Sequence, residues 1–117
     1  MASLSVRIDL GPKRIGPGKI ELLEKIEALG SISAAGRAMD MSYRRAWELV
    51  EEMNSLFTGP VVTPRTGGKQ GGGTQLTPLG HAVVAAYRTI EHDATEATRQ
   101  QVAALEAELS ALSTAAE

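Results

Sequence analysis

The sequence contains no cysteine and few aromatic residues. Without cysteine, the 117-residue chain can form neither a disulfide nor a metal site with thiolate ligands. Only one Trp, one Phe and two Tyr are present, so aliphatic and methionine side chains must build the core. No apolar run approaches the roughly 20 residues that a membrane-spanning helix needs, and residues 1–10 lack the apolar segment of a signal peptide. These absences predict one small cytoplasmic domain without membrane contact.

The charge of the chain is unevenly distributed, although the net charge is only −2. Residues 1–88 contain 11 Lys and Arg against 8 Asp and Glu, whereas residues 89–117 contain 1 against 6. A mildly basic body with an acidic tail suits a polyanionic partner for the body. Chance alone would also produce such an imbalance. Charge by itself therefore does not decide between a polyanionic partner and a chance distribution.

Apolar periodicity and turn residues predict a mainly α-helical chain with a small β-hairpin. The first segment alternates polar and apolar residues, as a short half-buried strand does. Three helices follow it, and two β-prone segments then flank a glycine-rich tip. A long helix ends the chain. The expected elements are a strand at 5–10, a turn segment at 11–18, helices at 17–30, 31–39 and 42–57, a hairpin at 58–77 and a helix at 78–112.

Two short helices joined by a tight turn at residues 40–41 are typical of a helix-turn-helix, whose second helix enters the DNA major groove. A hairpin directly after that helix makes the motif a winged variant. The first turn of helix 42–57 then faces DNA, where phosphate or guanine would compensate two arginines that oppose the helix dipole. The alternative is an ordinary solvated pair of arginines. The predicted DNA contacts here are Ser42, Tyr43, Arg44 and Arg45.

The hairpin tip "TGGKQGGG" (66–73) does not have the spacing of a phosphate-binding P-loop. Glycine instead lets the backbone approach a phosphate or a minor-groove wall, and Lys69 supplies positive charge. Arg65 and Thr66 stand at the end of the strand, where they would add phosphate contacts. The alternative is a hairpin tip without a partner.

No group of residues predicts catalysis or metal binding. His81 and His92 have no spaced set of further ligands around them, so we expect neither a metal site nor a cofactor. No Ser-His-acid grouping is present, and we expect a protein that is not an enzyme. Trp47 lies one turn after Tyr43 and one turn before Val50, which predicts a packing role in the core. The alternative is an exposed stacking surface.

The last helix carries apolar residues at heptad-like spacing with one phase shift. At about 1.5 Å per residue, residues 83–112 would extend about 45 Å, further than the preceding residues can cover. An exposed apolar seam of this length implies a second chain, or a helix packed in a partner, and the alternative is a long solvated helix. We therefore expect a DNA-binding domain at 1–80 and a dimerisation helix at 81–117, with its interface at Val83, Tyr87, Ile90, Ala94, Val102, Leu105, Leu109 and Leu112.

Two segments, "GSISAAGRAMDMSYRRAWELVEEMN" and "TPRTGGKQGGGTQLTPLG", together resemble the N-terminal DNA-binding domain of ModE-type, molybdate-responsive transcriptional regulators. The second helix and turn also resemble those of LysR-type regulators. The resemblance covers about residues 17–90 and implies a winged helix-turn-helix that binds a palindromic operator in double-stranded DNA as a homodimer. It assigns Arg65, Thr66, Lys69 and Gln70 to the wing, and it puts Ser31 and Ser33 where the second helix approaches the DNA backbone.

ModE-type regulators usually carry C-terminal molybdate-binding domains. This sequence ends after its last helix, so we expect a standalone regulator without the oxyanion-sensing residues, and any effector response would need a separate sensing partner. Two other functions stay open. One is a winged-helix adaptor that binds proteins, because fold alone does not decide function. The other is a protein that binds molybdate directly and does not bind DNA.

Overall fold

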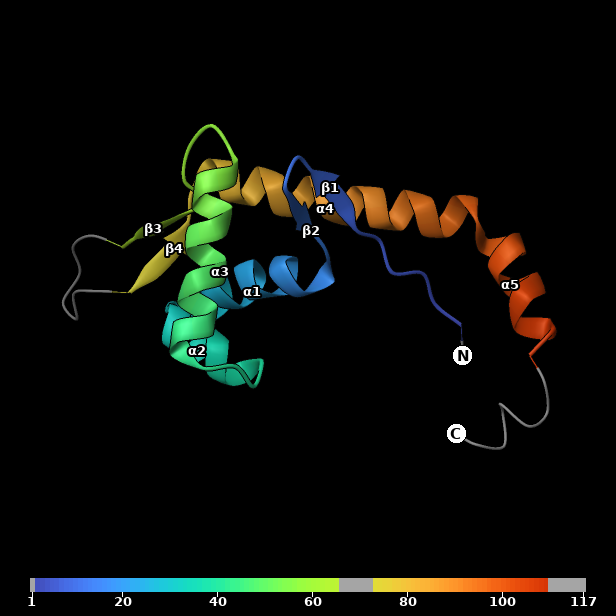
Figure 1. Ribbon diagram of the computed structural model, residues 1–117, viewed down its shortest axis with the longest axis horizontal. Helices are drawn as coiled ribbons and strands as arrows, with labels where there is room; N and C mark the ends of the chain where they lie inside the picture. The colour runs from blue at the N-terminus through green and yellow to red at the C-terminus, as the bar shows by residue number, and fades with distance from the viewer. Residues whose placement is uncertain (1, 66–72, 110–117) are drawn as a thin grey trace.

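A computed structural model describes residues 2–65 and 73–109 of the chain. Five helices and two separate two-stranded antiparallel sheets occur in these residues, so the prediction of a mainly α chain with a small β component is confirmed (Figure 1). The elements are β1 (Ile8–Leu10), β2 (Lys13–Ile15), α1 (Pro17–Leu29), α2 (Ile32–Ala38), α3 (Tyr43–Leu56), β3 (Val62–Pro64), β4 (Thr74–Leu76), α4 (Pro78–Ala97) and α5 (Arg99–Ala107).

Helices α1, α2 and α3 share one core, because each has an apolar stripe directed at the others. Leu23 and Ile26 of α1 and Met53 of α3 have no exposed surface. Helix α2 approaches α3 closely, since a Cβ atom added at Gly36 would lie only 3.2 Å from the Cβ of Ala46. The absence of a side chain at Gly36 therefore lets the two helices touch.

The connection between α2 and α3 is a tight turn, as predicted. Asp40 has a φ of 56°, in the left-handed region that short polar side chains tolerate. The N–H of Met41 donates to the carbonyl of Gly36 at 2.9 Å and closes the turn. Ser42 then caps α3, because its Oγ accepts the N–H of Arg45 at 3.0 Å. These bonds determine where α3 begins.

The N-terminal strand has a partner that the sequence analysis does not predict. Residues 11–18 are expected to be turn only, but β2 lies within them and pairs with β1, with Ile8 opposite Ile15. Gly11, at a φ of 65°, makes the reversal possible. Ile15 is buried in the core, and the neighbouring Lys13 and Arg14 are exposed. A three-residue strand that contains two cations has too weak an alternation to be recognised.

The second hairpin, β3 and β4, is attached to the end of α3. The Oδ1 of Asn54 accepts the backbone N–H groups of Val61 at 2.8 Å and Val62 at 3.1 Å. The strands pair with Val62 opposite Leu76. The predicted hairpin is therefore confirmed in its two strands, and residues 66–72 of its tip lie outside the described residues.

The same hairpin is also attached to α1. The N–H of Thr74 donates to the carbonyl of Gly30 at 2.8 Å, and the N–H of Leu76 donates to the Glu27 carboxylate at 2.9 Å. Strand β4 thus gains hydrogen-bond partners from the end of α1 on the edge that β3 does not cover.

Helix α4 passes over α1 and is joined to the core by its first half (Figure 1). Tyr87 is 2% exposed, and its hydroxyl donates to the carbonyl of Val6 at 2.7 Å. The Arg88 guanidinium donates to the two carboxylate oxygens of Glu24 at 2.7 and 3.1 Å and to Glu91 at 2.7 Å. These hydrogen bonds hold the pKa of Glu24 below its ordinary value, although partial burial acts in the opposite direction.

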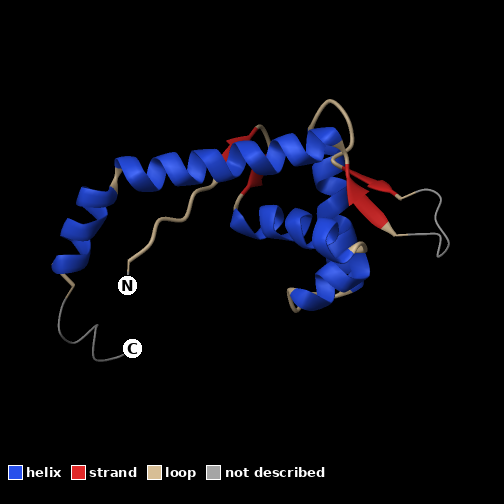
Figure 2. Cartoon of the chain, turned by 180° about the vertical axis from the view of Figure 1, so that it is seen from behind, coloured by secondary structure: helices blue, strands red, loops and turns tan. Residues whose placement is uncertain are grey.

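The prediction of one continuous helix over 78–112 is wrong. Helix α4 ends at Ala97, and α5 begins at Arg99 after a break at Thr98, whose hydroxyl donates to the carbonyl of Ala94 at 2.7 Å. Both views show α5 turning away from the line of α4 (Figures 1 and 2). The break falls where the apolar spacing shifts phase, so the shift marks a change of direction and not a stutter within one helix.

Candidate nucleic-acid interface

The first turn of α3 exposes the predicted cationic pair. The side chain of Arg44 is 87% exposed and that of Arg45 is 61% exposed, so neither guanidinium is buried. Both lie near the carboxylate of Glu48, with the Arg44 Nε 3.4 Å from Oε2 and the Arg45 Nη1 3.9 Å from Oε1. Ion pairs this exposed contribute little stability, which leaves both arginines accessible to an external anion.

The three serines predicted to contact DNA each take part in a local hydrogen bond. Ser31 caps α2 by accepting the N–H of Ala34 at 3.0 Å, and Ser33 accepts Nη1–H of Arg37 at 2.9 Å. Ser42 caps α3 in the same way. The oxygen is the acceptor in each bond, so the hydroxyl hydrogen can still be donated to a phosphate.

Of the four residues predicted for a wing, only one lies in the part of the chain that the structure describes. Arg65 is exposed at the end of β3, and its N–H donates to the carbonyl of Gly73 at 3.0 Å, which closes the described part of the hairpin. Thr66, Lys69 and Gln70 lie outside the described residues, and their DNA contacts stay a prediction.

Trp47 is not a core residue, contrary to the prediction, because 46% of its surface is exposed. The buried stripe of α3 includes Ala46, Val50 and Met53, and Trp47 lies beside that stripe. Tyr43, four residues earlier on the same side of the helix, is 56% exposed. The sequence spacing of Ala46, Val50 and Met53 identifies the buried side of α3, and Trp47 lies outside it, on the same side as Tyr43.

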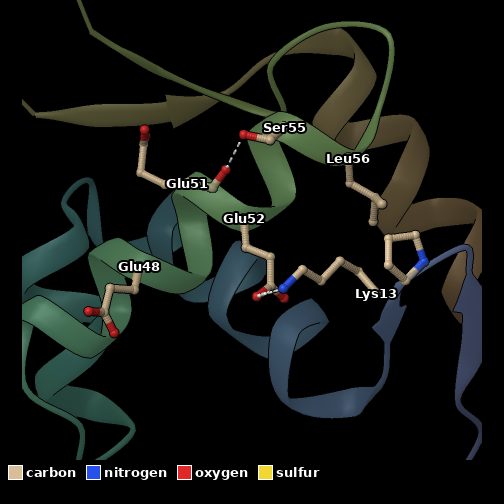
Figure 3. A pocket seen from close by; sticks show the side chains of 7 residues that line it. Lys13, Glu48, Glu51, Glu52, Ser55 and Leu56 are labelled. Carbon is tan, nitrogen blue, oxygen red and sulfur yellow. Dashed lines mark hydrogen bonds and ion pairs between the residues drawn. The ribbon is translucent and has the colours of Figure 1, made fainter.

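Another side of α3 is acidic. Glu48, Glu51 and Glu52 line a pocket of about 480 Å³ beside the β1–β2 turn (Figure 3). Glu52 forms ion pairs with Lys19 and, at 3.4 Å, with Lys13. The hydrogen bond from Lys19 lowers the Glu52 pKa, against the effect of burial. Carboxylates repel phosphate, so this acidic side of α3 is unfavourable for an approaching polyanion.

The residues predicted for the dimer interface differ in how exposed they are. The prediction for Tyr87 is wrong, because this side chain is buried within its own chain and is unavailable to a second one. Ile90, Leu105 and Leu109 are exposed, and Leu112 lies outside the described residues. The remaining three, Val83, Ala94 and Val102, are partly exposed. A groove of about 200 Å³ beside α4 is lined by Ile8, Leu10, Ile15, Phe57, Val83, Ala86, Tyr87 and Ile90.

Two kinds of feature are absent from residues 2–65 and 73–109. No helix in this part of the chain has both the length and the apolar character to cross a membrane. No group of three or more His, Cys, Asp or Glu side chains among the same residues could hold a metal ion.

The sequence is similar to proteins named for molybdenum-pterin binding, for molybdenum transport and for transcriptional regulation. It is 50% identical over 78 residues to the molybdenum-pterin-binding protein MopB of Rhodobacter capsulatus. The aligned region covers 67% of this chain and 29% of MopB. It is 43% identical over 91 residues to the molybdenum transport protein ModE of Azotobacter vinelandii, covering 78% of this chain and 33% of that protein.

A third relative is the DNA-binding transcriptional dual regulator ModE of Escherichia coli K12. The identity is 41% over 71 residues, covering 61% of this chain and 27% of that regulator. The chain thus matches only about a third of the length of each of these relatives. No family model matches the sequence.

Proposed function

We propose that this chain is the DNA-binding part of a ModE-type transcriptional regulator, a winged helix-turn-helix that binds a palindromic operator as a homodimer. The observation that carries the proposal is the exposed pair Arg44 and Arg45 at the capped start of α3, the helix to which the β3–β4 hairpin is attached. Relatives named as transcriptional regulators, one of them named as DNA-binding, support a regulatory role connected with molybdenum.

In this proposal α2 and α3 form the helix-turn-helix, and α3 lies in the major groove. That groove is about 12 Å wide and accepts one helix with its side chains. Ser42, Tyr43, Arg44 and Arg45 then face the base pairs and the flanking phosphates. Either arginine can bind O6 and N7 of a guanine with two parallel hydrogen bonds, and a duplex would also relieve the unfavourable position of two cations at a helix N-terminus.

The charges on α3 set the direction from which DNA approaches. The first turn is cationic, and the later turns carry the carboxylates of Glu48, Glu51 and Glu52. Ser31 and Ser33 of α2 flank the first turn on one side and donate to phosphates. Arg65, Thr66, Lys69 and Gln70 of the hairpin bind the backbone or the minor groove on the other side.

Residues 1–80 supply the DNA-contacting surface, and residues 81–117 supply the dimer surface. Ile90, Leu105 and Leu109 expose apolar side chains on α4 and beyond, and a second copy of the chain would remove them from water. A two-fold dimer then presents two α3 helices about 34 Å apart, which is one turn of B-DNA. An inverted repeat in the operator follows from this symmetry.

Two other functions have weaker support. An adaptor that binds proteins is favoured by the exposed Trp47 and by the acidic isoelectric point of about 5.7, but it has no need of an exposed arginine pair. Direct binding of molybdate is disfavoured at the pocket beside α3, because Glu48, Glu51 and Glu52 would repel an oxyanion there.

Selection from random duplex DNA is the first test, because it examines DNA recognition, symmetry and spacing together. The expected result is an enriched inverted repeat whose half-sites are one helical turn apart. Failure to enrich any sequence, together with elution from heparin at low salt, would contradict DNA binding and favour the adaptor.

Replacement of the two arginines is the second test and uses the selected duplex. Arg44→Ala and Arg45→Ala should each cost about 1–3 kcal/mol of binding free energy and relax the base preference at one position. Arg99→Ala is the matched control, because it removes the same charge from an exposed residue of α5. Equal affinities of all three variants would show that α3 does not read DNA.

A further inference from the structure

We infer that the aromatic pair Tyr43 and Trp47 is a contact site for thymine 5-methyl groups in the major groove. The inference rests on the proposed DNA binding and adds a base preference to it. The two residues are one helical turn apart on the same side of α3, and they are 56% and 46% exposed.

The core does not use these two rings. Ala46, Val50 and Met53 of the same helix are at most 2% exposed and complete the packing of α3 against its neighbours. The chain contains only four aromatic residues, and two of them lie exposed on one helix face. Leaving large apolar surface in water is unfavourable and often marks a binding surface.

The surroundings of the pair indicate which partner covers it. Arg44 and Arg45 lie in the same helical turn as Tyr43 and are exposed, so an anion bound there lies beside the rings. Trp47 also lines a pocket of about 160 Å³ between α3 and the β3–β4 hairpin. The other lining residues include the apolar Ile32, Val62 and Pro64 and one carboxylate, Glu51. Cations beside an apolar face match a duplex, which presents phosphates at the groove edge and base edges at its floor.

Thymine carries an apolar group that suits the rings. In the major groove each base pair presents hydrogen-bond donors and acceptors, and thymine adds the C5-methyl group. Cytosine has a hydrogen at that carbon, so a ring packed against the methyl group distinguishes the two pyrimidines by shape. The site would thus select A·T pairs next to the positions that the arginines contact.

The fluorescence of Trp47 provides the first test, because it is the only tryptophan of the chain. The full chain is titrated with the selected duplex, and binding is followed by anisotropy of a dye on the DNA. Acrylamide quenching of Trp47 should fall severalfold on saturation. Binding without a change in quenching would overturn this inference and leave the proposed function intact, whereas absence of binding would overturn both.

Replacement of single thymines by deoxyuridine, which lacks only the methyl group, is the second test. For at least one position, the wild-type chain should lose affinity about threefold to tenfold. Trp47→Ala should bind the unmodified duplex about tenfold more weakly and show no further loss with deoxyuridine at that position. A wild-type chain that tolerates every replacement, or losses that multiply in the variant, would overturn the inference.

Two further variants exclude a structural explanation. Trp47→Phe keeps an aromatic ring and should retain the response to deoxyuridine even if its affinity is lower. Leu29→Ala truncates an apolar side chain of similar exposure, 49%, at the end of α1, and it should respond to deoxyuridine as the wild type does. A Leu29→Ala chain that has lost the response would show that the effect belongs to the fold and overturn the assignment to Trp47.

Discussion

The side-chain oxygen of Asn54 accepts the backbone N–H of Val61 at 2.8 Å, and this bond joins the last turn of α3 to the start of the β3–β4 hairpin. Val61 has no exposed surface, so water cannot replace the acceptor. The same oxygen accepts the N–H of Val62. One amide side chain therefore holds the proposed reading helix and the proposed wing in a fixed relation.

Asn54→Ala should lower the free energy of unfolding by about 1–3 kcal/mol, because it leaves buried backbone N–H groups without an acceptor. Urea denaturation followed by circular dichroism measures the effect. Ser55→Ala is the matched control, since that exposed hydroxyl donates to the Glu51 carbonyl in its own helix, and it should stay within about 0.5 kcal/mol of the wild type. Equal losses in both variants would contradict the role given to Asn54.

Glu48→Gln should strengthen binding to DNA of mixed sequence about twofold to fivefold. The substitution removes a carboxylate that pairs with Arg44 and Arg45 and would repel phosphate, an effect of about 0.5–1 kcal/mol at close range in water. Fluorescence anisotropy at low salt gives the affinity. Asp93→Asn removes the same charge from an exposed position of α4, and a gain as large as that of Glu48→Gln would show that only net charge matters.

Acid should weaken the fold through Glu24. Its pKa lies below the ordinary value of 4.5 because Arg88 donates hydrogen bonds to the carboxylate. The carboxyl therefore stabilises the folded chain above about pH 4.5, and this contribution is lost as the pH falls through the lowered pKa. Urea denaturation between pH 7 and 3 should show a smaller acid-induced loss for Glu24→Gln than for the wild type.

Glu21→Gln serves as the control for this pH dependence, because Glu21 is an exposed carboxylate on the same helix. It should keep the acid-induced loss of the wild type. Some acid-induced loss of stability should also persist in Glu24→Gln. The pKa of Glu52 is lowered by the hydrogen bond from Lys19, so protonation of Glu52 also destabilises the fold at low pH. A Glu24→Gln chain with the full wild-type pH dependence would contradict the assignment.

Gly80→Ala should destabilise the chain by about 1–3 kcal/mol or more, because a Cβ atom at Gly80 would lie 2.1 Å from the carbonyl oxygen of Val61. Helix α4 would have to move away from Val61, the residue before β3. Gly18→Ala is the control, since a Cβ atom in this first turn of α1 meets nothing within 4 Å, and it should stabilise the chain by up to about 1 kcal/mol. Thermal unfolding of the two variants should therefore shift in opposite directions.

The first three helices could be predicted because their signals are local. Ser31 and Ser42 stand directly before apolar stripes, and both act as N-caps in the structure. Gly30 ends α1 with a φ of 80°, as a helix-ending glycine does. Periodicity and capping involve residues only a few positions apart, so both can be recognised directly in the sequence.

The parts that escaped prediction depend on contacts between distant residues. Arg88 meets Glu24 across 64 positions of sequence, and Tyr87 meets Val6 across 81. The burial of Tyr87 follows from the second contact, which no heptad pattern contains. The prediction for Trp47 fails for a different reason. Its spacing from Val50 places it near the buried stripe of α3, but the ring lies at the edge of that stripe and stays 46% exposed.

The attachment of β4 to the end of α1 has a consequence for how this scaffold can change. Thr74 and Leu76 are held by Gly30 and Glu27, so the base of the hairpin belongs to the helical body and not to the glycine-rich stretch at 66–72. In the proposed complex, insertions or replacements in that stretch would alter the contacts of the hairpin with a duplex without reorienting α3. Half-site preference and backbone affinity would thereby be free to evolve separately.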